Sequence, residues 1–102
     1  MKIDSKETLI GYSRSIKPGD YFSEFNEQVI RRENVYVLSQ FLIEASTYIC
    51  LINLKTGNRF SEPLRINRVK EGGIIQDRDF KSLSCGLYLY KYPPNFINFL
   101  QE

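Results

Sequence analysis

The sequence contains no histidine and no tryptophan among its 102 residues. Histidine is the commonest general base and the commonest metal ligand, so its absence excludes Ser-His-Asp and Cys-His mechanisms within one chain. The only two cysteines, Cys50 and Cys85, cannot complete a structural zinc site, which needs four nitrogen or sulfur ligands. We therefore expect no metal and no cofactor.

Each cysteine lies among apolar or small residues, in the segments 48–52 and 84–87. This setting is typical of reduced thiols in the core of an intracellular protein, and a Cys50–Cys85 disulfide is the alternative. The chain also lacks the apolar run of ~20 residues that spans a bilayer. The first seven residues lack the apolar stretch of a signal peptide. We expect a cytoplasmic protein without membrane contact.

Neither sign of charge dominates the sequence. Fourteen basic and twelve acidic side chains give a net charge of +2, too small a surplus to mark a nucleic-acid binder. Hydrophobic residues make up 42% and charged residues 25%, values that exclude a disordered tail, a collagen-like chain and a coiled coil. A chain of this length forms one domain with a single core.

Short segments rich in β-branched and aromatic residues alternate with turns. The predicted strands span 21–25, 34–43, 47–54, 64–69 and 87–92. The clearest turn joins the strand 47–54 to a return strand over 59–61 and places Gly57 in a left-handed conformation. Pro63 interrupts the return strand, so that strand is an edge or carries a bulge.

Two short helices complete the prediction. We expect Asp77 to cap a helix over 77–83, and Asn95 to cap a final one that carries Phe96, Ile97, Phe99 and Leu100. The fold class is mainly β: a small bent antiparallel sheet, or an SH3-like or OB-like barrel, with these two helices. Residues 1–16 are interpreted as an N-terminal arm or edge strand, and residues 17–102 as a single small β domain.

Three tyrosines alternate near the end of the chain. Tyr88, Tyr90 and Tyr92 are predicted to emerge on one face, while Leu87 and Leu89 face the core. Such a row suits base stacking or contact with another protein, unless the C-terminal helix folds over it. If this strand is a sheet edge, its free peptide groups and its tyrosines predict a homodimer with these rings at or near the interface.

Basic side chains form a second candidate site. Arg59, Arg65 and Arg68 lie in a stretch with a surplus of positive charge, and Arg31 and Arg32 form another pair. Guanidinium groups pair with phosphates bidentately, so these residues suit a nucleic-acid groove or the phosphates of a small nucleotide. An ordinary solvated face is the alternative.

The acidic residues and glycines favour no catalytic site. Asp20, Asp77 and Asp79 are the only candidates for a hydrolase or nuclease, and a helix start explains Asp77 and Asp79. Neither Gly19 nor Gly72-Gly73 is followed by the Lys-Ser or Lys-Thr of a phosphate-binding loop. We predict that the protein is not an enzyme.

Three motifs in the middle of the chain resemble a pattern of small phage and mobile-element β proteins. They are Gly19–Phe22, Val35–Leu38 and Ile52–Gly57, which match the order G-D-x-F, Y-x-L and N-L-x-T-G. Phage proteins of this size without catalytic residues often block a host enzyme, sequester a signalling nucleotide or coat nucleic acid. The resemblance implies a binder in the host cytoplasm and transfers no site residue.

The sequence thus predicts a non-catalytic binding protein whose partner is a host or defence protein or a small nucleotide. The alternative is a module for single-stranded DNA or RNA that uses a basic, aromatic sheet face. The candidate binding residues are Arg59, Arg65, Arg68, Tyr88, Tyr90 and Tyr92.

Overall fold

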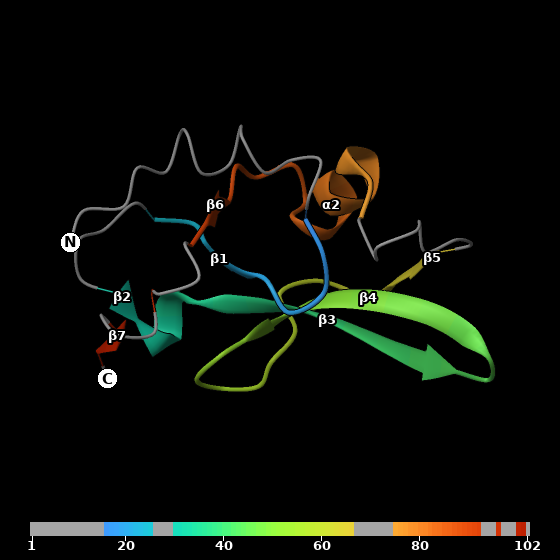
Figure 1. Cartoon of the computed structure of the whole chain (residues 1–102), viewed down its shortest axis with the longest axis horizontal. Coiled ribbons are helices and arrows are strands. Elements are labelled where there is room, and N and C mark those ends of the chain that lie inside the picture. The colour runs from blue at the N-terminus through green and yellow to red at the C-terminus, as the bar shows by residue number, and fades with distance from the viewer. Residues whose placement is uncertain (1–15, 26–29, 67–74, 93–95, 97–99, 102) are drawn as a thin grey trace.

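The computed structural model describes residues 16–25, 30–66, 75–92, 96 and 100–101 (Figure 1). Within these residues, one pair of strands is much longer than the others: β3 (Tyr36–Ile43) and β4 (Ser46–Asn53). The shorter strands are β1 (Tyr21–Ser23), β2 (Ile30–Arg31), β5 (Leu64–Ile66), β6 (Tyr90–Lys91) and β7 (Leu100–Gln101). The helical elements are the 3₁₀ turn η1 (Arg32–Asn34) and the α-helix α2 (Asp77–Leu83).

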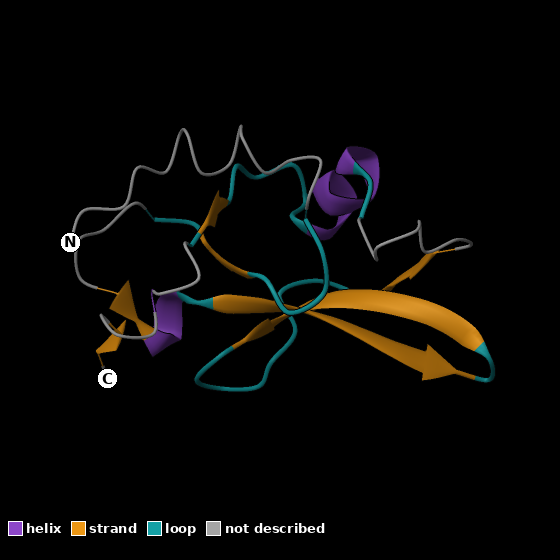
Figure 2. Cartoon of the chain, in the orientation of Figure 1, coloured by secondary structure: helices purple, strands orange, loops and turns teal. Residues whose placement is uncertain are grey.

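Five of the strands form one antiparallel sheet in the order β5-β4-β3-β1-β6, and β2 and β7 form a separate parallel pair. The mainly β class and the antiparallel sheet are confirmed. The barrel, which the sequence left as an alternative, is not formed, because β5 and β6 end as the two edges of the sheet rather than pairing with each other. Figure 2 shows this open arrangement, with the β3–β4 hairpin as its longest part.

The β3–β4 hairpin is paired along its whole length, from Tyr36 opposite Asn53 to Ile43 opposite Ser46. Its strands agree with the predicted segments 34–43 and 47–54 to within two residues. Glu44 and Ala45 form the connection with φ values of 49° and 67°. Two successive positive φ angles are those of a type I′ turn, which matches the twist of the paired strands.

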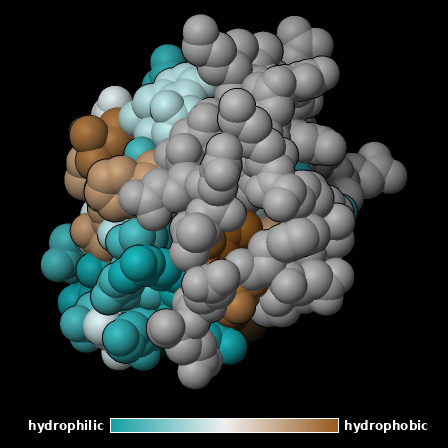
Figure 3. All heavy atoms as spheres, turned by 90° about the vertical axis from the view of Figure 1, so that its left-hand side faces the viewer, coloured by the Kyte–Doolittle hydropathy of each residue, from teal (hydrophilic) through white to brown (hydrophobic). Residues whose placement is uncertain are grey.

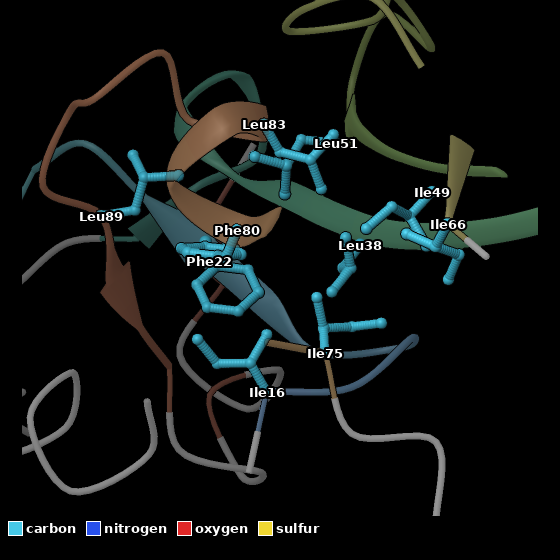
Figure 4. Close-up of a cluster of buried hydrophobic side chains, with 10 residues drawn as sticks. All are labelled: Ile16, Phe22, Leu38, Ile49, Leu51, Ile66, Ile75, Phe80, Leu83 and Leu89. Atoms are coloured by element: carbon cyan, nitrogen blue, oxygen red, sulfur yellow. The ribbon is translucent and has the colours of Figure 1, made fainter. Parts of the chain in front are cut away.

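The main hydrophobic core lies on the face of the sheet that α2 covers (Figure 4). Phe80 of α2 packs against Phe22 of β1 with ring centroids 4.7 Å apart. Ile16, at the start of the described chain, is buried in the same core, and its carbonyl accepts a hydrogen bond from the Ile75 amide. The buried members are Ile16, Phe22, Leu38, Ile49, Leu51, Ile66, Ile75, Phe80, Leu83 and Leu89.

A second, smaller core forms on the other face of β1. Tyr21 and Phe22 are neighbours in a strand, so their side chains point to opposite faces. Tyr21 packs on Phe96 with centroids 4.7 Å apart, and Tyr92 stacks on the same ring at 5.0 Å. The buried members are Ile30, Val35, Tyr92 and Phe96, with Tyr21, Leu54 and Leu100 packed against them.

The prediction of a C-terminal helix is wrong at Leu100, which lies in strand β7 and pairs with Ile30. Pairing with β2 satisfies backbone groups at this end of the chain, and Leu100 packs against the second core. Phe96 is buried there as well, whereas residues 93–95 and 97–99 lie outside the described residues. So do residues 1–15 of the expected arm and residues 67–69 of the fourth predicted strand.

The last predicted strand is shorter than expected, because the described strand covers only Tyr90 and Lys91. After α2 the chain turns through Cys85 and Gly86, which have φ values of 56° and 77°. The Leu87 amide then donates to the Ser84 carbonyl, which keeps Leu87 at the helix end and 51% exposed. The prediction that Leu87 faces the core was therefore wrong.

Helix α2 has the predicted bounds but not the predicted cap. Gln76 occupies the N-cap position, and its carbonyl accepts hydrogen bonds from the Asp79 and Phe80 amides. Asp77 is therefore the first helical residue rather than the cap.

The turn after β4 is built around Asn53 and Gly57. The Asn53 side-chain oxygen accepts hydrogen bonds from the Lys55 and Thr56 amides, and Gly57 has φ = 76° as predicted. The return segment bridges Ile52 with Arg59. It resumes after Pro63 as β5, an edge strand, which confirms one of the two roles predicted for the segment.

Replacing Gly57 with valine should lower the stability of the fold by about 1 kcal/mol or more, because a β-branched residue rarely adopts a positive φ. A Cβ at this position has no heavy atom within 4 Å, so backbone strain accounts for the loss. Thermal melts of the two proteins measure it. Gly57→Asn is the control and should lose less, since asparagine tolerates this conformation. An unchanged melting temperature for Gly57→Val would contradict the assignment.

Candidate functional site

A hollow of about 530 Å³ lies where η1 meets the turn after β4, and it is lined by Arg31, Arg32, Glu33 and Lys55. We call it the basic pocket. Figure 3 views this end of the molecule and shows hydrophilic side chains gathered on its lower part. Among the described residues, three basic side chains and one carboxylate line this pocket.

The second core holds the backbone of the basic pocket from below. Ile30 and Val35 are buried on either side of the segment that carries Arg31, Arg32 and Glu33. The Val35 amide donates to the Arg32 carbonyl at 3.1 Å, which closes the 3₁₀ turn between these two anchors. Buried apolar residues that flank a charged turn keep its side chains directed outward.

Two hydrogen bonds bring Lys55 to the same place. The Leu54 amide donates to the Val35 carbonyl at 2.8 Å, so the turn after β4 lies against the end of η1. The Asn53 side-chain amide donates to the Glu33 carbonyl at 2.9 Å. The backbone of Lys55 is therefore placed by the residues on its N-terminal side, and its side chain is exposed.

Glu33 is only loosely paired with Arg31 and Lys55. The two oxygens of Glu33 lie 4.0 Å from Arg31 and 4.0 Å from Lys55, and all three side chains are more than half exposed. Exposed ion pairs of this length stabilise a protein by about 0–1 kcal/mol. One carboxylate thus bridges two cations weakly, and an incoming anion can replace it at little cost.

The predicted arginines lie elsewhere and do not form one cluster. Arg59 is exposed and pairs with Glu62 at 3.7 Å, while Arg65 is exposed on β5 opposite Tyr48. Arg59 forms a β-bridge with Ile52, whereas Arg65 is opposite Tyr48. Ile52 and Tyr48 are four residues apart on β4, so the two arginines are separated by about 13 Å along this strand. Arg68 lies outside the described residues.

The tyrosines are divided between the surface and the second core. Tyr88 is 50% exposed and meets Tyr90 edge to face at 5.2 Å. Tyr92 is only 5% exposed because Phe96 stacks on it within the same chain. Tyr92 is therefore not available as part of an outward row, which is the outcome expected if the C-terminal segment folds back.

The candidate arginines and tyrosines also lie toward opposite edges of the sheet. Arg65 belongs to β5 and Tyr90 to β6, the two edge strands, with β4, β3 and β1 between them. Four strand spacings amount to about 19 Å. Arg65 and Tyr90 therefore do not combine into one compact basic and aromatic patch.

Two of the three carboxylates considered for catalysis, Asp20 and Asp79, have structural partners. Asp20 forms a largely buried ion pair with Lys91 at 3.2 Å and accepts a hydrogen bond from the Lys17 amide. Asp79 lies 4.0 Å from Arg78 of the same helix. Among the residues whose placement is described, no three His, Cys, Asp or Glu side chains are grouped to hold a metal ion.

Comparison of the chain with protein families, with curated proteins and with solved structures finds no match. In the described part of the chain, no helix has the length and hydropathy needed to cross a membrane. Lys55 is the pocket residue that the sequence did not indicate, because only the fold brings it beside Arg31.

The two cysteines are both free, so the alternative of a disulfide was wrong. Cys50 is buried, and its thiol donates to the Ser61 carbonyl with the sulfur 3.5 Å from the oxygen. Burial raises the pKa of Cys50, against a smaller opposite effect from Arg59. Cys85 is exposed after α2 rather than placed in the core, since the left-handed turn directs it outward.

A thiol-specific reagent at mildly alkaline pH should therefore modify Cys85 quickly and Cys50 slowly. The raised pKa of Cys50 lowers its thiolate fraction, and its burial limits access. Absorbance after addition of an aromatic disulfide reagent follows both reactions. Cys85→Ser should remove the fast phase, and both thiols should react quickly in denaturant. Two equal rates in the native protein would contradict this arrangement.

Proposed function

We propose that this protein is a non-catalytic binding protein that holds a small phosphate-bearing ligand, a nucleotide, in the basic pocket. The observation that carries the proposal is the convergence of Arg31, Arg32 and Lys55 on one hollow, whose described lining includes one carboxylate, Glu33. The volume of about 530 Å³ is within the range of small-molecule sites.

The chemistry of the side chains suits phosphate. A guanidinium group donates two parallel hydrogen bonds to two phosphate oxygens, and a lysine adds a mobile charge. Binding exchanges the two 4.0 Å ion pairs of Glu33 for short charge-assisted bonds to the ligand. The displaced carboxylate is then able to accept a hydrogen bond from a ribose hydroxyl or a base N–H group.

The alternative is a module for single-stranded nucleic acid on the sheet face. That function needs Arg59 and Arg65 to act with Tyr88 and Tyr90, which lie toward opposite edges of the sheet. Nucleotide binding is favoured because its residues are already together. Together with the resemblance to phage and mobile-element proteins, nucleotide binding implies that the protein sequesters a signalling nucleotide in a host cytoplasm. A host or defence protein is the other candidate partner.

Isothermal titration with ATP, a cyclic dinucleotide and uncharged adenosine tests the proposal. One or both nucleotides should bind, adenosine should not, and the affinity should fall as salt is raised. Arg31→Ala and Lys55→Ala should each weaken binding by about tenfold or more, since each removes a charge-assisted hydrogen bond. The nucleotide should be recovered intact after incubation, as expected of a binder without catalysis.

Two variants distinguish the pocket from general surface charge. Arg65→Ala is the matched control and should leave the affinity unchanged, because Arg65 is exposed on β5 outside the pocket. Glu33→Gln should tighten binding about twofold to fivefold by removing a competing anion. Equal losses in Arg31→Ala and Arg65→Ala would contradict the proposal. Binding of an oligonucleotide that depends on Arg59 and Tyr88 would favour the alternative.

A further inference from the structure

The outer edge of β3 has no neighbouring strand among the described residues beyond the point where β1 ends. β1 pairs with Tyr36 and Val37, and the turn over 17–20 binds the Leu38 amide and carbonyl through Asp20 and Gly19. From Ser39 to Ile43 the strand continues to the hairpin tip with a partner on one side, β4.

The peptide groups that face outward on this edge follow from the register. In antiparallel pairing, residues direct both backbone groups alternately to one neighbour and to the other. Leu38 directs its groups away from β4, toward Gly19 and Asp20. Gln40 and Leu42 therefore present their N–H and C=O groups outward as well. Gln40 and Leu42 are both exposed, and the exposed fraction of Leu42 is 70%. This edge is therefore accessible to another strand.

The side chains do not protect the edge. All eight residues of β3 are uncharged, and none is glycine or proline. Natural proteins guard an exposed edge with a lysine, a proline or a bulge, because an uncharged strand with free peptide groups readily adds a further strand. On one face of β3, Phe41 stacks on Tyr48 with centroids 6.0 Å apart, which adds an aromatic surface beside the free edge.

We propose that a second copy of this chain adds to this edge, with β3 against β3 in antiparallel orientation and Phe41 on the two-fold axis. The free edge runs from Ser39 to Ile43, so Phe41 is its midpoint. The outward groups of Gln40 and Leu42 are placed symmetrically about that midpoint. Each Gln40 then faces a Leu42 of the other copy, which gives about four backbone hydrogen bonds across the axis.

The same register explains why a second copy fits this edge better than an unrelated peptide. It places the two Phe41 rings opposite each other as a non-hydrogen-bonded pair, the closest kind of cross-strand contact. It also brings the hairpin tip of each copy, with Glu44, to the end of the other copy's free edge at Ser39, where the turn that carries exposed Lys17 begins to cover the strand. A basic and an acidic side chain are thus matched twice by symmetry.

This interface differs from the tyrosine strand that the sequence suggested, since it uses β3 rather than Tyr88, Tyr90 and Tyr92. Sedimentation of the full chain tests it from about 1 to about 100 µM, because the dimer population depends on protomer concentration. The mass should rise toward about 24 kDa, twice the 12.0 kDa of one chain. A mass that stays at 12.0 kDa throughout would overturn the proposal.

Leu42→Lys should return the protein to the monomer while its circular dichroism and melting temperature stay close to those of the wild type. Leu87→Lys is the matched control, since it places the same charge at another exposed leucine, and it should remain dimeric. Gln40→Pro is a second test, because it removes an outward amide without touching the ladder to β4. A dimer that survives both β3 variants, or one that only Tyr88→Ser/Tyr90→Ser dissociates, would overturn the proposal.

A charge exchange tests the register itself. Lys17→Glu should raise the dissociation constant of the dimer by about fivefold, because two symmetric ion pairs are lost. Adding Glu44→Lys in the same chain should restore the affinity, since each pair is rebuilt with its charges reversed. If the double variant is as weak as Lys17→Glu, the two copies do not meet in this register and the proposal fails.

Discussion

The fold depends on the opposite orientation of two adjacent side chains, Tyr21 and Phe22. β1 has only three residues, yet it pairs with β3 on one side and with β6 on the other. Phe22 completes the core under α2, and Tyr21 completes the core around Phe96. The alternation of a β-strand is thus the link between two clusters on opposite faces of one sheet. The Asp20–Lys91 ion pair, at 3.2 Å, fastens the same strand to β6.

The core around Phe96 determines the backbone geometry of the basic pocket. Ile30 and Val35 fix the ends of the charged segment, and Leu54 fixes the turn that carries Lys55. The pocket therefore consists of charged side chains on a backbone that apolar packing holds in place. This combination is common in binding sites, because charged groups bind with least loss of entropy when the chain that carries them is already ordered.

Local signals in the sequence were sufficient for most of the secondary structure. β-branched residues located the β3–β4 strands, and Thr56-Gly57-Asn58 located a turn whose glycine has the expected positive φ. The turn at Glu44-Ala45 carries no such signal, since neither residue favours that conformation. Leu87 was misplaced because period-two alternation was extended through a helix end. The sequence indicated Arg31 and Arg32 of the pocket as a basic pair. It did not indicate Lys55, because hydrogen bonds between segments distant in the sequence bring this residue to the pocket.

The two long sides of the β3–β4 hairpin are unequal, and this bears on how far assembly can proceed. On the β4 side, the return segment is interrupted at Pro63, and β5 then pairs with β4 and presents the exposed Arg65. β6, at the other end of the sheet, has two residues and carries Lys91. Among the described strands of the five-stranded sheet, β3 has the longest uncharged stretch of free edge. An isologous contact consumes the surface that makes it, so association through β3 ends in a closed pair and not in a fibre.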